Sequence, residues 1–372
     1  MVCPEYRLRL FLSVDLVGST AFKAKHGAPS LDVERATPNP AWVDQIRHFY
    51  RDFPERVQRS YEKLDKPASL EKYNSAPQVW KTIGDEIVFC CRLSSREHLA
   101  ACVRAFVGAL EQYGQYLDSV GRLLDVKGYG WVAAFPSPNV TVVVSSGRQT
   151  AQPDPKVTPE FPDEAIEVKA DAIPSQFDFL GKEIDAGFRT GRHCSADKLS
   201  LSLELSWLLT SLRENVHVRG VEFAYHGRQE LKGVLNSRPY PIFSIDVERN
   251  ENRREVRVRE RIVSGVRETP SALHIHDFLQ SFFADEDIEF PALRRLEADQ
   301  LENELPANYR EYQKNWTAIA EEIQRRWKNE SDAADAEGDG HAQEDDAISD
   351  AAKHVLSRVR GDAIETPAEP QE

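Results

Sequence analysis

Two apolar runs that meet at a Gly-Asp dipeptide constrain the fold of this 372-residue chain more than any other feature. In the segment VWKTIGDEIVFCCRL (79–93), strand-type sequence stands on both sides of Gly84 and Asp85. A glycine between two such runs is typical of a tight hairpin turn, because glycine adopts positive φ without steric cost. We therefore predict a β-hairpin over 79–93, with Asp85 at its tip.

A second strand is predicted at the N-terminus. Residues 7–16 (RLRLFLSVDL) form an apolar run that ends near Asp15, and Gly18, Ser19 and Thr20 follow with turn and helix N-cap chemistry. If this strand lies antiparallel beside the hairpin, the carboxylates of Asp15 and Asp85 fall side by side. The pair is the first candidate for a functional site.

The remaining pattern alternates helices with strands. Apolar residues at steps of three and four predict long helices over 39–57 and 95–119. Further helices are predicted for DFLGKEIDAGFR and LSLELSWLLTSLR, and strands for LLDVKGYGWVAAF, VTVVV, HVRGVEFAYHGRQELKG and PYPIFSIDV (178–189, 201–213, 123–135, 140–144, 217–233 and 239–247). Residues 145–162, rich in Pro, Ser, Thr and Gln, predict a surface loop.

We predict three parts of the chain: a main domain over 1–247, an extension over 248–329 and an acidic tail over 330–372. The extension contains a helix predicted for 305–328. The tail has nine acidic residues and no Lys or Arg between 330 and 350, a composition that favours disorder.

Composition argues against several classes of function. The formal charge of −14 argues against a general nucleic-acid binder, because neutralising phosphates requires concentrated Lys and Arg. No apolar run is long enough to span a membrane, and the N-terminus lacks signal-peptide features. The five cysteines have no spacing suited to zinc and are expected to be free thiols. A cytoplasmic protein is the expectation.

Two neighbouring aspartates could bind a pair of divalent ions. Such ions, roughly 4 Å apart, activate an attacking oxygen and neutralise a departing phosphate. Carboxylate and carbonyl oxygens suit Mg²⁺ and Mn²⁺, so we predict Asp15, Leu16 and Asp85 as ligands of two Mn²⁺ or Mg²⁺ ions. The backbone N–H groups of the GSTAF segment would cradle phosphate oxygens; its residues are Gly18, Ser19, Thr20, Ala21 and Phe22.

Three ordered segments carry a family resemblance. VDLVGSTAF and KTIGDEIVF resemble the two metal-site segments of class III adenylate and guanylate cyclases, and DFLGKEIDAGFR resembles their third motif. The resemblance covers residues 7 to about 245. It implies an α+β fold with a ferredoxin-like cyclase domain and a mainly antiparallel sheet. It also implies a head-to-tail homodimer, in which each active site takes residues from both subunits.

The resemblance further implies roles for individual residues. Asp178 and Lys81 stand at base-reading positions, Arg189 at the position of the transition-state arginine, and Lys232 at that of a triphosphate-binding lysine. Asp185 departs from the family, which usually has a ribose-orienting asparagine there. A carboxylate at neutral pH only accepts hydrogen bonds, whereas an amide also donates them.

The substrate base is not decided by hydrogen bonding. A lysine donor and an aspartate acceptor suit adenine, and they also suit the O4 and N3–H of uracil. Tyr50 or Phe49, from the first long helix, could fill the space that a pyrimidine leaves. Over the whole chain the sequence resembles the Pycsar pyrimidine cyclases, particularly uridylate cyclases, which implies UTP as substrate, cyclic UMP as an antiphage signal and a separate effector that responds to it.

Three alternatives remain open at this stage. An adenylate cyclase is supported directly by Lys81 and Asp178. A nucleotide sensor without catalysis is suggested by Asp185. A nucleic-acid-binding role, suggested by the arginines over 253–267, is weaker because acidic residues are interspersed with them.

Overall fold

The structure is a computed structural model that describes residues 2–27, 40–66, 75–121, 124–144, 163–265, 270–296 and 305–336. By its internal contacts the chain divides into two compact units, residues 1–317 and 318–372. The loop predicted over 145–162 and the tail beyond 336 lie outside the described residues. The predicted boundaries at 247 and 329 stay predictions.

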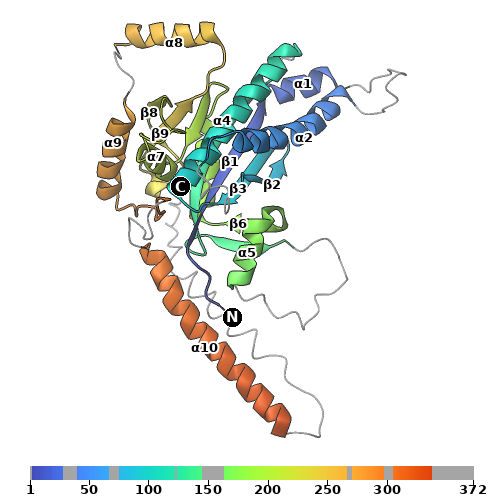
Figure 1. The fold of residues 1–372 in the computed structure, drawn as a ribbon, viewed down its shortest axis with the longest axis vertical. Coiled ribbons are helices and arrows are strands. Elements are labelled where there is room, and N and C mark those ends of the chain that lie inside the picture. The colour runs from blue at the N-terminus through green and yellow to red at the C-terminus, as the bar shows by residue number, and fades with distance from the viewer. Residues whose placement is uncertain are drawn as a thin grey trace, which may run out of the picture. The chain divides into compact units, whose positions relative to one another are not determined.

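A seven-stranded mixed sheet organises the first unit (Figure 1). Its strand order is β2-β3-β1-β4-β7-β9-β8, and every neighbouring pair is antiparallel except β4 and β7. A separate ribbon pairs β5 with β6. The strands are β1 (Arg7–Val17), β2 (Gln78–Ile83), β3 (Glu86–Arg92), β4 (Asp125–Phe135), β5 (Val140–Val143), β6 (Phe177–Leu180), β7 (Lys198–Leu201), β8 (Phe223–Glu230) and β9 (Pro239–Asp246). The predicted α+β class, with a mainly antiparallel sheet, is confirmed.

Helices connect and cover these strands. They are α1 (Ser19–Lys25), α2 (Ala41–Glu62), α4 (Arg96–Ser119), α5 (Glu164–Ala172), α6 (Lys182–Thr190), α7 (Leu203–Thr210), α8 (Glu251–Val263), α9 (Ala272–Asp285) and α10 (Ala307–Ala336). The helices predicted over 39–57, 95–119 and 305–328 are confirmed as α2, α4 and α10. The last of these continues through Ala336, further than predicted.

Residues of β1 alternate between the two faces of the sheet, as the pleat requires. Its even-numbered residues lie in the larger core, together with apolar residues of α2 and α4, which lie close to each other in Figure 1. Its odd-numbered residues lie on the opposite face; they are Arg7, Arg9, Phe11, Ser13, Asp15 and Val17. All the charged residues of β1 therefore lie on one face.

A smaller aromatic core fills the middle of that opposite face. The rings of Phe11 and Trp131 are stacked with centroids 5.1 Å apart, and Phe179 of β6 meets Phe11 edge to face at 5.5 Å. Gly187 lets α6 lie against this core, because a Cβ there would be 2.3 Å from the Trp131 side chain. The face is thus covered by the β5–β6 ribbon and α6.

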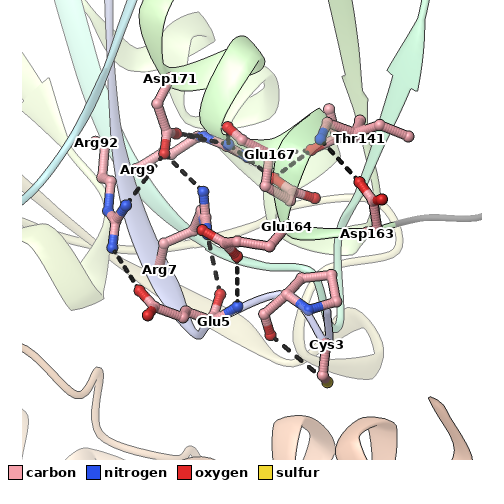
Figure 2. A network of polar contacts seen from close by, with 12 residues as sticks. Cys3, Glu5, Arg7, Arg9, Arg92, Thr141, Asp163, Glu164, Glu167 and Asp171 are labelled. Carbon is pink, nitrogen blue, oxygen red and sulfur yellow. Dashed lines mark hydrogen bonds and ion pairs between the residues drawn. The ribbon is translucent and has the colours of Figure 1, made fainter. Parts of the chain in front are cut away.

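At the start of β1 the same face buries two arginines (Figure 2). The Arg7 side chain is 0% exposed and pairs with Glu164 at 2.5 Å and Asp171 at 2.7 Å. The Arg9 side chain, also 0% exposed, pairs with Glu167 at 2.7 Å and Asp171 at 2.6 Å. All three acids belong to α5, so this network attaches α5 to the central strand.

Two predicted helices were wrong in their first residues. In 178–189 the residues up to Leu180 belong to β6, and α6 begins only after Gly181. In 201–213 the first residue, Leu201, is the last residue of β7, which pairs with both β4 and β9, and α7 begins after Ser202. Ser202 accepts a hydrogen bond from the Leu205 N–H, which satisfies one of the unpaired donors at the start of the helix.

Candidate active site

The two aspartates lie at the same end of the sheet. The ladder of β1 and β3 places Asp15 opposite Glu86, the residue that follows Asp85. Gly84 occupies the hairpin turn with φ 65°, and the Leu16 N–H donates to the Asp85 carbonyl at 3.3 Å. The predicted hairpin, and the side-by-side position of its tip and β1, are confirmed by this pairing.

Each aspartate carboxylate contacts one lysine. Lys127 Nζ of β4 lies 3.1 Å from Asp15 Oδ2, and Lys23 Nζ of α1 lies 3.3 Å from Asp85 Oδ1. Burial raises the pKa of Asp15, and the negative charges of Asp85 and Glu86 add to this effect while Lys127 opposes it. The end of the sheet therefore concentrates negative charge that favours cations.

A third carboxylate lies beside the pair. Glu86 Oε1 accepts hydrogen bonds of 2.5 Å from both Ser13 Oγ and Tyr129 Oη. These two donors hold Glu86 against the sheet. The sequence analysis did not predict Glu86, Lys23 or Lys127 as site residues. Lys127 could not have been found, because the strand register that places it opposite Asp15 leaves no signal in the sequence.

The segment predicted to cradle phosphate oxygens, residues 18–22, forms the start of the short helix α1. Gly18 is the N-cap residue of α1 with φ 84°, and no side chain caps the helix. The Ser19 hydroxyl instead donates to Asp85 Oδ2, so the predicted N-cap role of the side chains is wrong. Thr20 and Ala21 are exposed and Phe22 is half-buried.

Tyr50 reaches the tip of the hairpin. Its hydroxyl, on α2, donates a hydrogen bond to the Gly84 carbonyl, next to Asp85. The side chain is half-buried, whereas Phe49 is fully buried in the larger core. Of the two aromatic residues proposed for the base, only Tyr50 is accessible.

Lys81 and Asp178 form an ion pair. Lys81 Nζ of β2 lies 2.9 Å from Asp178 Oδ1 of β6, and the two side chains are 34% and 37% exposed. Lys81 Nζ also lies 3.8 Å from the centroid of the Trp80 ring, a cation–π contact that fixes its position. The structure therefore brings together the two predicted base-reading residues, which are 97 positions apart in the chain.

Arg189 and Lys232 also meet. Arg189 Nη1 of α6 donates to the Lys232 carbonyl, in the connection between β8 and β9. Gly233 permits this approach, because it has φ 70° and a Cβ there would be 2.8 Å from Arg189 Nη1. Asp185, one turn before Arg189 on α6, is exposed.

The predicted site residues form three separate groups in one chain. Asp15 and Asp85 with Tyr50 are the first group, Lys81 with Asp178 the second, and Arg189 with Lys232 the third. In the described ranges, no hydrogen bond or ion pair joins one group to another.

The donor set of the first group fits hard divalent cations. Carboxylate oxygens are the ligands that Mg²⁺ and Mn²⁺ prefer. In the part of the chain that the structure describes, no three His, Cys, Asp or Glu side chains converge as metal ligands. A bound ion would therefore take further ligands from main-chain carbonyls, water or a substrate phosphate.

The sequence matches no protein-family model and no curated protein. Solved structures that resemble this one include the adenylyl cyclase CyaB from P. aeruginosa, at 14% identity and a TM-score of 0.41, covering 65% of this chain and 94% of that one.

Two further structures give similar values. They are the guanylyl cyclase Cya2 (15% identity, 68% and 98% coverage, TM-score 0.38) and the guanylate cyclase domain of RhGC from Catenaria anguillulae in complex with GTP (10%, 65% and 97%, 0.37). These similarities are too low to assign the chain to a family, so its function has to be inferred from the site residues.

No described helix is long and apolar enough to cross a membrane.

Proposed function

We propose that this chain is a nucleotidyl cyclase that converts a nucleoside triphosphate into a 3′,5′-cyclic monophosphate and pyrophosphate. In this reaction the 3′-oxygen bonds to the α-phosphorus, and the bond between that phosphorus and the oxygen leading to the β-phosphate breaks. The observation that carries the proposal is the position of Asp15 on β1 next to Asp85 in the adjacent β2–β3 turn, each beside a lysine.

Asp15, Asp85 and the Leu16 carbonyl would hold two Mn²⁺ or Mg²⁺ ions. Such ions, when bound, lower the pKa of the 3′-hydroxyl and neutralise charge on the departing pyrophosphate. The protein's own contribution is to keep both carboxylates at one end of a rigid sheet. The segment Gly18–Phe22 would lie against the phosphates.

Arg189 would stabilise charge that develops at the α-phosphate. Its guanidinium remains protonated and offers several donors to phosphoryl oxygens. Lys232, exposed beside it, would contact the end of the triphosphate. Loss of Arg189 should therefore reduce turnover more than substrate binding.

A head-to-tail homodimer would complete the site. Within one chain the aspartates and Arg189 belong to separate groups, and a second copy would bring Arg189 of one subunit to the aspartates of the other. Mixing Asp15→Ala subunits with Arg189→Ala subunits should restore part of the activity, because one of the two shared sites is then intact. Absence of any restoration would argue against shared sites.

We favour UTP as substrate and cyclic UMP as product, acting as an antiphage signal on a separate effector. Lys81 would donate to O4 of uracil, and Asp178 would accept from N3–H. The half-buried position of Tyr50 at the hairpin tip supports a pocket in which an aromatic side chain fills part of the space. The signalling role is supported by the sequence resemblance alone.

An adenylate cyclase is the second candidate, and the Lys81–Asp178 pair favours it equally. A sensor without catalysis is the third, because the exposed Asp185 cannot donate a hydrogen bond to a ribose oxygen when it is ionised.

One experiment separates these candidates. Purified protein with Mn²⁺ is given ATP, GTP, CTP and UTP separately, and the products are resolved by mass and chromatography. Cyclic UMP from UTP supports the proposal. Cyclic AMP from ATP would support the proposed reaction but show that the substrate is ATP. Nucleotide binding with no cyclic product from any triphosphate would refute catalysis and leave the sensor.

A further inference from the structure

One aromatic residue beside the Lys81–Asp178 pair has no role so far. Phe188 lies on α6, and its half-buried ring packs against the smaller core. Its centroid lies 5.1 Å from that of Trp131 and 5.8 Å from Lys81 Nζ. The ring therefore adjoins the cation of the pair and remains partly open to solvent.

The backbone fixes the place of this ring. Gly187 precedes Phe188, and any Cβ at 187 would overlap the Trp131 indole. Helix α6 consequently packs with its backbone directly against the Trp131 side chain of β4, so the position of Phe188 is set by a tight contact. Phe188 is held more firmly than a ring on a loop would be.

The surroundings of the pair leave Phe188 as an accessible stacking surface. Trp80 also contacts Lys81, but it is only 2% exposed, and its indole N–H donates to the Phe177 carbonyl at 2.9 Å. Trp131 is fully buried. A ligand that reached Lys81 and Asp178 from solvent would find a donor, an acceptor and the partly exposed Phe188 ring.

We infer that Phe188 is a specificity-determining residue, against which a heterocyclic base packs while Lys81 and Asp178 bind its edge. This inference rests on the proposed function and extends it to base selection. When the contact between Lys81 and Asp178 opens, a planar base with an acceptor next to a donor can bind both residues: its acceptor takes a hydrogen bond from Lys81, and its donor gives one to Asp178. Under this inference a base of one ring packs against Phe188, and a base of two rings requires the side chain to move.

Binding of a nucleotide that cannot cyclise tests the inference without catalysis. The probe is α,β-methylene UTP with Mn²⁺, titrated into wild type, Phe188→Ala and Phe188→Tyr by calorimetry. Because stacking on an aromatic side chain contributes about 1–3 kcal/mol per base, Phe188→Ala should weaken binding about five- to a hundredfold. Phe188→Tyr should restore most of it.

Phe278→Ala is the matched control. Phe278 is also a half-buried phenylalanine, but it packs against Tyr225 and Phe243 in the larger core. Phe278→Ala should lower thermal stability about as much as Phe188→Ala does, but it should leave nucleotide affinity close to that of wild type. Equal affinity of Phe188→Ala and wild type overturns the inference, and so does a wild type that does not bind the probe.

Base preference provides a second measurement. The ratio of kcat/KM for UTP to that for ATP should fall at least about tenfold in Phe188→Ala, because the purine gains space while the pyrimidine loses its stack. An unchanged ratio overturns the inference. A wild type that binds the probe through Phe188 and yet cyclises no nucleotide refutes the proposed function and leaves the inference standing.

Discussion

The two ends of one strand face differ in how they hold charge. At the start of β1, Arg7 and Arg9 are 0% exposed and share three carboxylates of α5 (Figure 2). At its other end Asp15 is 27% exposed and contacts the ammonium of Lys127. We call the first end, where the arginines are fully buried, the closed end, and the second, where the ion pair is partly exposed, the open end.

This difference separates a structural from an exchangeable site. Buried ions lose their hydration, so a buried network is stable only when every charge is paired and hydrogen-bonded. Half-exposed pairs contribute little, because water competes for both partners. The Arg7–Arg9 network thus fixes α5, whereas the lysines beside Asp15 and Asp85 can be replaced by other cations at small cost.

The largest expected effect is on catalysis at the open end. Asp15→Ala and Asp85→Ala should each reduce cyclisation at least about a thousandfold, because each removes a carboxylate that the proposed ions require. Thermal stability should change little. Product formation with Mn²⁺ and circular dichroism check both points, and Asp118→Ala, an exposed aspartate of α4, is the control. Substantial activity in either variant would contradict the proposed mechanism.

The closed end should respond in stability instead. Asp171→Ala leaves Arg7 and Arg9 buried with one carboxylate partner each, so the free energy of unfolding should fall by about 3–5 kcal/mol. Urea denaturation at pH 7 measures the change. The exposed i,i+4 pair of Arg59 and Glu55 gives the matched control, since Glu55→Ala should cost less than about 1 kcal/mol. Equal losses in the two variants would refute the distinction.

A different carboxylate, that of the half-buried Glu183, has no ion pair among the described residues. Glu183 Oε2 accepts from the Ala134 N–H at 2.7 Å and from Asn139 Nδ2 at 2.8 Å. Burial raises the pKa of Glu183 from 4.5 to about 7, and the nearby Glu204 adds to the shift while these hydrogen bonds oppose it. Folding therefore favours the protonated form.

The sign of the pH dependence follows from this shift. Between pH 4.5 and about 7 the unfolded chain has released this proton and the folded chain retains it. The contribution to the free energy of unfolding is thus complete below pH 4.5 and falls by about 3 kcal/mol as pH rises through 7. Glu183→Gln should remove this slope in urea denaturation at pH 5 and 8. A slope identical to that of wild type would show that Glu183 is not its source.

The sequence predicted the elements that local patterns determine. The apolar run in 7–16 and the glycine at position 84 identified β1 and the hairpin, and helical spacing identified α2 and α4. Strand β7 was missed because its apolar residues run directly into those of α7, and an apolar run does not distinguish a buried strand from a helix. Ser202, a good N-cap residue between them, was the available signal.

Contacts between distant segments could not be predicted. Arg7 and Arg9 alternate with apolar residues, a pattern typical of a solvated strand face, yet acids more than 150 positions away bury them. The carboxylates of Asp15 and Asp85 were identified from the strand and hairpin patterns and from motif resemblance, whereas the lysines beside them depend on strand register and on the path of α1. Neither the strand register nor the path of α1 can be inferred from the local sequence.

The smallest expected effect concerns the lysine that contacts Asp15. Lys127→Ala removes a cation that competes for the Asp15 carboxylate, so Mn²⁺ should bind more tightly in the absence of nucleotide. The contact is about one-third exposed and therefore weak, and a gain of about two- to fivefold in affinity is expected. Mn²⁺ binding followed by electron paramagnetic resonance measures it, with Lys25→Ala, an exposed lysine of α1, as the control. Unchanged or weaker binding would mean that Lys127 supports the ion site rather than occupying part of it, and the open end would then resemble the closed one.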